Sequence, residues 1–216
     1  METMVRIKIC GITNFDDART AANLDVDALG FIFYSKSPRC VDPLKVREIV
    51  GKLPPFVSRV GVFVDEDFDK MINTCRTAGI DTVQLHGKES PDYCSRVPFP
   101  VIKAFSVEPS TDLSGLSLYN VAGFLLDTWH ADKRGGTGMA FDWTIAKRAC
   151  LMYGNIILAG GLGPSNLLEA IDAVEPYGVD VNSGVEIKPG IKNPHKMREA
   201  INIVKNWRRS TPQPEV

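Results

Sequence analysis

Three side chains with proton-transfer chemistry each stand where a short apolar run of this sequence ends. They are the thiol of Cys10, the imidazole of His86 and the carboxyl of Asp127. A thiol and a carboxyl suit general acid–base catalysis, provided that the thiol is partly ionised and the carboxyl partly protonated. Residue alternation along a strand places Lys8 on the same face as Cys10, where an ammonium would lower the pKa of the thiol.

Each of these residues also has a purely structural interpretation. Cys10 could be a small buried side chain, and Asp127 could form a loop hydrogen bond, although it follows a continuous apolar run. His86 could be a satisfied polar group or a substrate contact. Arg39, in a polar loop, could be a solvated charge or the partner of a ligand carboxylate. The residue types alone leave these alternatives open.

A glycine-rich stretch, residues 156–166, joins an apolar strand to a helix and is a candidate phosphate site. Gly160 and Gly161 would let the backbone approach a ligand, and Pro164 suits the first helical turn. Backbone N–H groups at a helix start favour an anion. Ser183 and Gly184 end the next strand, so they would neighbour the glycine turn at one edge of the sheet, and the two could bind a phosphate together.

The chain alternates between apolar strands and amphipathic helices, which predicts a parallel sheet. Eight such units favour closure into a (β/α)8 TIM barrel, with a short or irregular fifth helix where Pro109, Gly115 and several serines interrupt the pattern. We expect a single domain over residues 1–209 and a flexible tail over residues 210–216. The expected strands are Val5–Gly11, Ala28–Tyr34, Ser58–Val64, Thr82–Gly87, Val101–Ser106, Gly123–Thr128, Ile156–Ala159 and Gly178–Gly184.

Composition excludes several classes of function. The 216 residues carry a net charge of -1, which does not indicate binding to nucleic acid or to an anionic membrane surface. No apolar run approaches the roughly 20 residues of a membrane span, and the first residues lack the apolar core of a signal peptide. The five cysteines form no CxxC pair, so neither a disulfide framework nor a zinc cluster is expected. We therefore expect a cytoplasmic protein.

Short motifs along almost the whole chain resemble, in their order, those of the phosphoribosylanthranilate isomerase family. Each motif is short, but their joint order is highly specific. They are Lys8–Thr13 (KICGIT), Gly30–Phe33, Ser37–Arg39, Gly61–Val64, Val83–Gly87 (VQLHG), Gly135–Gly138 with Phe141–Trp143, Leu158–Leu162 (LAGGL) and Val181–Glu186 (VNSGVE).

The resemblance implies a single-domain barrel of tryptophan biosynthesis that catalyses the third step committed to that pathway. Such an aldose–ketose isomerase converts N-(5-phosphoribosyl)anthranilate to 1-(2-carboxyphenylamino)-1-deoxyribulose 5-phosphate, an Amadori rearrangement that needs no cofactor and no metal. The only partner implied is this small phosphorylated substrate, and the chain is expected to be a monomer or a homodimer.

The resemblance also implies a role for each candidate residue. Cys10 would be the general base, Asp127 the general acid, and Arg39 the group that holds the anthranilate carboxylate. The remaining candidates would contact the substrate: His86 and Asp180 near the sugar, and Gly160, Gly161, Ser183 and Gly184 at the phosphate.

Three other functions are compatible with the residues. A Schiff-base aldolase could use Lys8 or Lys103, because each lysine lies in an expected strand and a desolvated lysine can act as a nucleophile. A metal-dependent sugar-phosphate epimerase is harder to build, because His130 and His195 lie outside the strand ends. A phosphosugar-binding barrel without catalytic activity is the third.

Overall fold

The chain folds into a closed barrel of eight parallel strands, as the sequence predicts. A computed structural model describes residues 4–108, 110–127 and 143–207. Each strand pairs with the next, and β1 closes the barrel by pairing with β8, with Lys8 opposite Asp180. The strands are β1 (Arg6–Ile9), β2 (Ala28–Ile32), β3 (Ser58–Phe63), β4 (Thr82–Leu85), β5 (Val101–Ser106), β6 (Gly123–Asp127), β7 (Ile156–Ala159) and β8 (Gly178–Val181).

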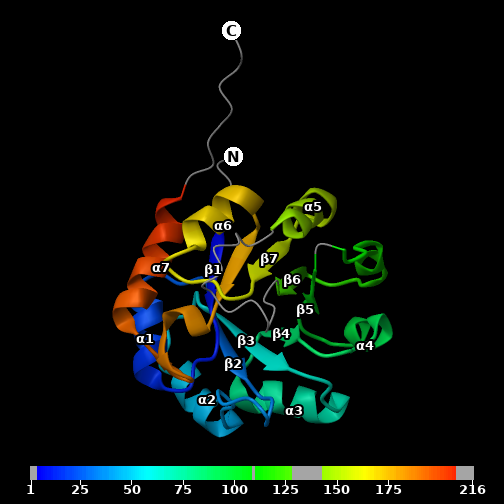
Figure 1. The fold of residues 1–216 in the computed structure, drawn as a ribbon. Coiled ribbons are helices and arrows are strands. Elements are labelled where there is room, and N and C mark those ends of the chain that lie inside the picture. The colour runs from blue at the N-terminus through cyan, green and yellow to red at the C-terminus, as the bar shows by residue number, and fades with distance from the viewer. Residues whose placement is uncertain (1–3, 109, 128–142, 208–216) are drawn as a thin grey trace.

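Helices surround the barrel and cover its outer face (Figure 1). The expected irregular fifth connection is a short 3-10 helix over Ser114–Leu118, between β5 and β6. The α-helices are α1 (Phe15–Asn23), α2 (Pro43–Val50), α3 (Phe68–Ala78), α4 (Pro91–Ser95), α5 (Thr144–Tyr153), α6 (Leu167–Val174) and α7 (Pro194–Asn206).

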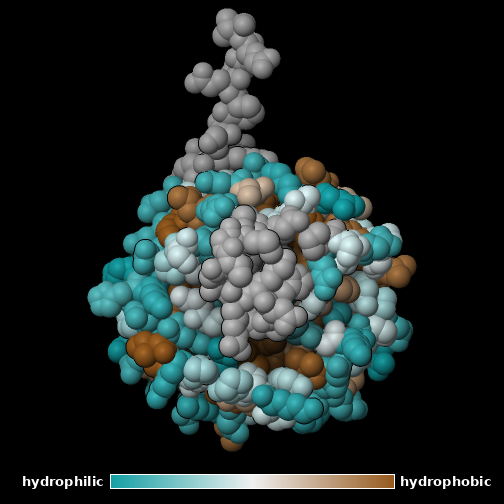
Figure 2. Space-filling model, viewed as in Figure 1, coloured by the Kyte–Doolittle hydropathy of each residue, from teal (hydrophilic) through white to brown (hydrophobic). Residues whose placement is uncertain are grey.

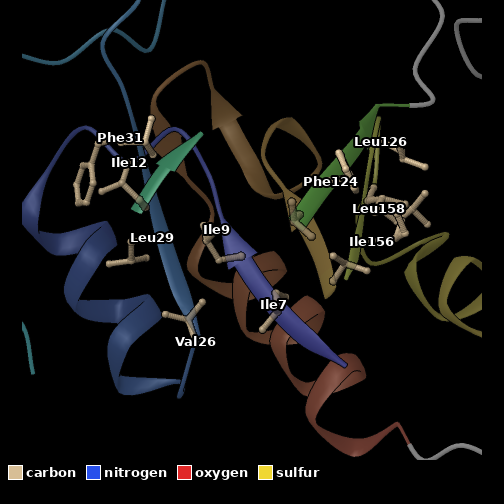
Figure 3. Close-up of a cluster of buried hydrophobic side chains, with 14 of the residues drawn as sticks. Ile7, Ile9, Ile12, Val26, Leu29, Phe31, Phe124, Leu126, Ile156 and Leu158 are labelled. Carbon is tan, nitrogen blue, oxygen red and sulfur yellow. The ribbon is translucent and has the colours of Figure 1, made fainter. Parts of the chain in front are cut away.

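Most of the hydrophobic core lies between the barrel and its helices. On the outer face of β1 and β2, toward the helices, the buried side chains are those of Ile7, Ile9, Leu29 and Phe31 (Figure 3). The residues that alternate with them therefore face the interior of the barrel. The interior holds a smaller apolar cluster built around Ala104, Leu125 and Ala159, with Ile102 and Ile157 packed against it. Toward the carboxyl ends of the strands the interior also holds polar side chains, among them Cys10, His86 and Asp127, beside the apolar Ile32 and Val62.

Local sequence signals set several helix ends as expected. Asn14 accepts a hydrogen bond from the backbone N–H of Asp17 and caps α1. Asp42 caps α2, which opens with Pro43. Gly79 ends α3 with a left-handed backbone (φ 73°) that glycine adopts without a steric penalty. These caps position the loops between strands and helices.

Two local expectations were wrong. Helix α6 begins at Leu167 and not at Pro164: residues 164–166 form a turn in which the N–H of Asn166 donates to Gly163 O at 3.1 Å, a spacing tighter than that of an α-helix. The last strand ends at Val181 and not at Gly184: Ser183–Val185 is a 3-10 turn, and β9 (Glu186–Lys188) and β10 (Ile191–Lys192) form an antiparallel hairpin. The motif at residues 135–138 and the expected tail 210–216 lie outside the described residues.

Among the described residues, no helix is long and apolar enough to span a membrane. The face in Figure 2 is mostly hydrophilic, with small separate hydrophobic areas.

Candidate active site

A cavity of about 430 Å³ opens at the carboxyl ends of the strands, where parallel barrels carry their active sites. Cys10, directly after β1, and Asp127, at the end of β6, both line it. Strands β7 and β8 lie between these two strands in the barrel. Most of the expected site residues therefore share one cavity. Its polar and glycine lining is Cys10, Arg39, Gln84, His86, Asp127, Gly160, Gly161, Asp180, Asn182 and Ser183.

Cys10 lies beside a buried ion pair. The Nζ of Lys8 donates to Oδ1 of Asp180 at 2.8 Å, and both side chains are almost fully buried. Burial raises the pKa of the Cys10 thiol, and Asp180 acts in the same direction, whereas the Lys8 ammonium lowers it. Lys8 therefore acts on this pKa in the expected direction, but burial outweighs it, so that the pKa of Cys10 lies above its ordinary value.

Lys8 nevertheless stays charged. Burial opposes its ammonium, but the Asp180 carboxylate and the Cys10 sulfur outweigh burial, so that the pKa of Lys8 lies above its ordinary value. The thiol of Cys10 and the ammonium of Lys8 can lie this close to β2 because residue 30 of that strand is a glycine. A Cβ at Gly30 would lie 2.8 Å from Cys10 Sγ and 3.0 Å from Lys8 Nζ. The strand next to Cys10 thus leaves room for a thiol with an ammonium beside it.

Asp127 ends β6 and faces a histidine. The Nε2 of His86 lies 3.8 Å from Oδ2 of Asp127, and about a third of each side chain is exposed. Burial lowers the pKa of His86 despite the opposing effect of Asp127, so the imidazole is neutral near pH 7. Its Nδ1 lies 3.2 Å from Nε2 of the buried Gln84. The Gln84 amide fixes the ring that faces the carboxyl. Gln84 lies in the VQLHG motif and on the same strand face as His86, but it is not among the expected site residues.

The two glycine-containing turns lie side by side at one rim of the cavity. Gly160 and Gly161 both have left-handed backbones, with φ of 99° and 64°. A Cβ at Gly163 would lie 3.1 Å from Cα of Gly184, so the turns touch there. Gly160, Gly161 and Ser183 line the cavity, whereas Gly184 packs against the other turn and does not line it. Backbone turns of this kind are suited to an anion.

Arg39 reaches the cavity from the loop after β2. Its guanidinium makes two hydrogen bonds to Glu186 of the hairpin, at 2.9 Å from Nε and 2.6 Å from Nη2. Glu186 lies in one of the motifs of the resemblance, but its pairing with Arg39 spans 147 residues and has no local sequence signal.

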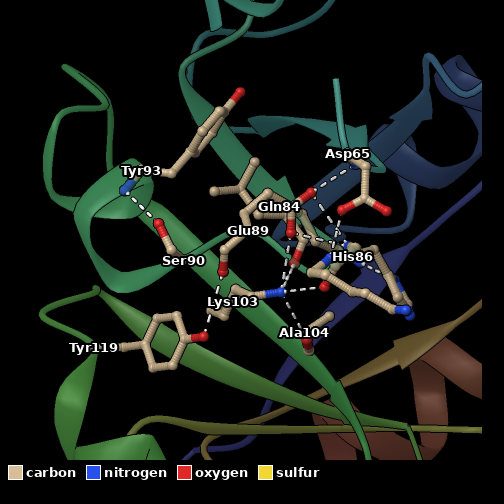
Figure 4. A network of polar contacts seen from close by, with 12 residues as sticks. Asp65, Gln84, His86, Glu89, Ser90, Tyr93, Lys103, Ala104 and Tyr119 are labelled. Carbon is tan, nitrogen blue, oxygen red and sulfur yellow. Dashed lines mark hydrogen bonds and ion pairs between the residues drawn. The ribbon is translucent and has the colours of Figure 1, made fainter. Parts of the chain in front are cut away.

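Lys103 does not reach the cavity, although it lies on a barrel strand. Its Nζ donates to Glu89 Oε2 at 3.0 Å and to three backbone oxygens, those of Leu85, Gly87 and Ala104 (Figure 4). Glu89 in turn accepts from the backbone N–H groups of Asp65 and Gly87. This network fixes the end of β4, next to His86. Lys103 is a poor nucleophile, because its amino group is fully engaged in hydrogen bonds. Lys8 is a poor nucleophile too, because it is charged. Both observations argue against a Schiff-base aldolase.

A second cavity, of about 530 Å³, opens at the opposite end of the barrel. Its charged groups already pair with one another: Asp27 accepts from Arg6 at 3.0 Å and from Lys205 at 3.1 Å. The lining of this second cavity includes no cysteine, and its aspartates are paired with Arg6 and Lys205. The candidate base and acid, Cys10 and Asp127, line the smaller cavity. Across the described part of the chain, no group of three or more His, Cys, Asp or Glu side chains is arranged to hold a metal ion.

Comparison with known proteins decides the family. The family model described as N-(5'-phosphoribosyl)anthranilate (PRA) isomerase matches residues 7–203. The chain belongs to the N-(5'-phosphoribosyl)anthranilate isomerase family. It is 51% identical, over 94% of its length and 99% of the relative, to the isomerase of Geotalea uraniireducens.

Solved structures agree with this PRA isomerase assignment. The chain resembles monomers generated from the dimeric phosphoribosylanthranilate isomerase of Thermotoga maritima, with a TM-score of 0.84, 38% identity, and coverage of 94% of this chain and 100% of that one. It also resembles an isomerase in complex with reduced 1-(o-carboxyphenylamino)-1-deoxyribulose 5-phosphate, with a TM-score of 0.81, 37% identity and the same coverage.

Proposed function

We propose that this protein isomerises N-(5-phosphoribosyl)anthranilate to 1-(2-carboxyphenylamino)-1-deoxyribulose 5-phosphate in tryptophan biosynthesis. The observation that carries the proposal is that Cys10 and Asp127 line one cavity together with Arg39 and the two glycine-containing turns. Such an arrangement offers a base, an acid and an anion site at each end of a small molecule. The solved relative that holds a carboxyphenylamino deoxyribulose phosphate supports the same substrate class.

The reaction needs one acid and one base. Asp127, protonated, donates a proton to the furanose oxygen, which opens the ring and gives a Schiff base. Cys10, as thiolate, then removes the C2′ proton to give an enolamine, which tautomerises to the ketone. His86 is neutral near pH 7 and does not trap the Asp127 carboxyl in a strong ion pair, because 3.8 Å exceeds the range of a hydrogen bond.

The base has to ionise before it can act. Because burial raises its pKa, the Cys10 thiol is mostly protonated near pH 7, and the thiolate is a minor form. The Lys8 ammonium is the nearby group that stabilises that thiolate. Asp180 is tied to Lys8, so its main role is to hold the ammonium in place, with a sugar contact as a second role.

The two ends of the substrate are held apart by separate anion sites. The turns at Gly160, Gly161, Ser183 and Gly184 bind the phosphate; Gly184 lets the turns approach each other. Arg39, which lines the same cavity, binds the anthranilate carboxylate. Fixing both ends places the sugar between acid and base and removes part of the entropic barrier.

Purified protein tests the proposal. Incubated with N-(5-phosphoribosyl)anthranilate, it should consume the substrate, which is followed by fluorescence. Binding of the phosphosugar without turnover would support a non-catalytic barrel instead. That the enzyme is cytoplasmic, and that it is a monomer or a homodimer, stay predictions; analytical ultracentrifugation measures the latter.

A further inference from the structure

The side chain that would bind the substrate carboxylate is itself held by another carboxylate. Arg39 donates from Nε and Nη2 to the two oxygens of Glu186, a fork that fixes the plane of the guanidinium. The Glu186 side chain is 4% exposed and that of Arg39 18%. Within the described part of the chain, Nη1 of Arg39 donates no hydrogen bond, so that end of the guanidinium is available to a ligand.

Glu186 is fixed in turn by the hairpin that carries it. The fully buried Lys192 donates to Glu186 Oε1 at 2.9 Å, and the backbone N–H of Gly190 donates to the same oxygen at 3.2 Å. Lys192 Nζ also donates to Oδ1 of Asn182 at 3.0 Å. The hairpin is anchored to the rest of the barrel by Thr13, whose hydroxyl donates to Gly190 O at 2.6 Å. None of these bonds is needed to close the eight-stranded barrel.

The charges in this cluster do not balance. Burial opposes ionisation of Glu186, but the hydrogen bonds from Arg39 and Lys192 hold its pKa below the ordinary value. The hydrogen bonds to Glu186 also raise the pKa of Arg39. One carboxylate therefore faces the guanidinium of Arg39 and the amino group of Lys192, whose pKa burial lowers although Glu186 opposes this. While Lys192 is protonated, the cluster carries one more positive than negative charge. A bound anion would complete the balance.

The backbone next to Cys10 is shaped for the same cluster. Gly11 has a left-handed backbone (φ 72°), and a Cβ there would lie 2.6 Å from Asn182 Oδ1 and 2.7 Å from Arg39 Cδ. Asn182 and Arg39 thus close over the residue that follows the base. The anion site of Arg39 and the thiol of Cys10 are held in one unit, so the position of a bound carboxylate fixes the sugar relative to the base.

We propose that Glu186 and Lys192 are positioning residues that hold Arg39 for the aryl carboxylate of the substrate. The β9–β10 hairpin then determines specificity for an N-aryl aminosugar phosphate with a carboxylate on the ring. This inference rests on the proposed function, and it adds residues that contact no substrate atom themselves.

The test compares two substrates, N-(5-phosphoribosyl)anthranilate and N-(5-phosphoribosyl)aniline, which lacks the carboxylate. In Glu186→Gln the charged fork is lost, and KM for the anthranilate substrate should rise about tenfold with kcat little changed. For the aniline substrate kcat/KM should stay within about twofold of the wild type, because that substrate offers nothing to Arg39. The preference for the carboxylate therefore falls about tenfold. Glu48→Gln on α2, an exposed site with the same charge change, should leave the preference unaltered.

A double-variant cycle shows whether Glu186 acts through Arg39. In an Arg39→Ala background, Glu186→Gln should cause no further loss of preference. Equal losses for both substrates, or an unaltered preference, would overturn the inference. If Glu186→Gln does not fold, Glu186→Asp can replace it in the test. Its side chain is one methylene shorter, so the carboxylate keeps its charge but no longer reaches Arg39, and the preference for the anthranilate substrate should fall in the same way. Wild-type turnover of the anthranilate substrate tests the proposed function separately, so the two failures are distinguishable.

Discussion

Lys8 and Asp180 form a buried ion pair next to Cys10, with 2.8 Å between Nζ and Oδ1. The pair joins the first strand of the barrel to the last, where the two residues stand opposite each other in the register. It keeps an ammonium beside the thiol, which partly offsets the effect of burial in favour of the neutral sulfhydryl. Closure of the barrel is therefore also what assembles the proposed base.

The pH dependence of the reaction should report this base. Since burial raises the pKa of Cys10, the thiolate fraction, and with it kcat/KM, should rise by about tenfold per pH unit over the range in which Asp127 stays protonated. Lys8→Met removes the cation that stabilises the thiolate, so the pKa rises further and the profile should move at least about one unit to higher pH. The pH–rate profile of each protein measures this. A profile unchanged by Lys8→Met would show that the ammonium does not act on the base.

Space beside the thiol is a second requirement. Gly30→Ala should lower kcat/KM on the order of a hundredfold, because its Cβ would displace Cys10 Sγ and Lys8 Nζ. The matched control is Gly115→Ala, where a Cβ meets nothing within 4 Å. Steady-state kinetics of both variants, with circular dichroism to verify the fold, measure the effect. Full activity in Gly30→Ala would mean that the position of the thiol is not critical.

A negative charge at the phosphate turns should weaken substrate binding. Ser183→Asp places a carboxylate on the cavity wall, where it repels the phosphate, and KM should rise at least about tenfold. The exposed Ser117→Asp, on the 3-10 helix after β5, serves as the control for the charge. Steady-state kinetics give KM, and inhibition by inorganic phosphate gives a second reading. An unaltered KM and unaltered inhibition would place the phosphate elsewhere.

Lys103 should matter for stability and not as a nucleophile. Lys103→Met leaves the buried Glu89 without its cation, which should cost about 3–5 kcal/mol of unfolding free energy. Urea unfolding measures this loss. Borohydride added during turnover should leave no substrate adduct on any lysine of the wild type. A trapped adduct on Lys103 or Lys8 would instead favour the aldolase.

The local pattern of the sequence was enough to predict the barrel and much of its site. Helix ends at Asn14 and Gly79 follow from side-chain caps and from a glycine with positive φ, which are local rules. Cys10 and Asp127 could be selected because each follows an apolar run that has to end at the same face. These predictions needed only alternation and the topology of parallel barrels.

What the sequence did not reveal depends on contacts between distant residues. The pKa of Cys10 depends on burial and on an ion pair that joins residues 172 positions apart. The hairpin at Glu186 contains only a few residues and a Pro189-Gly190 turn, and its stability comes from the buried Lys192 and from Thr13. Lys8 meets Asp180 through the register of β1 with β8, which no local sequence pattern specifies.

The most direct test of the account is the turnover of N-(5-phosphoribosyl)anthranilate by the wild type, Cys10→Ser and Asp127→Asn, measured by fluorescence. The wild type should consume the substrate. Each variant should lose at least about a hundredfold in kcat, the low end for acid–base catalysis, while its thermal midpoint stays close to that of the wild type. Near-normal turnover in either variant, or a wild type that leaves the substrate intact, would contradict the central claim.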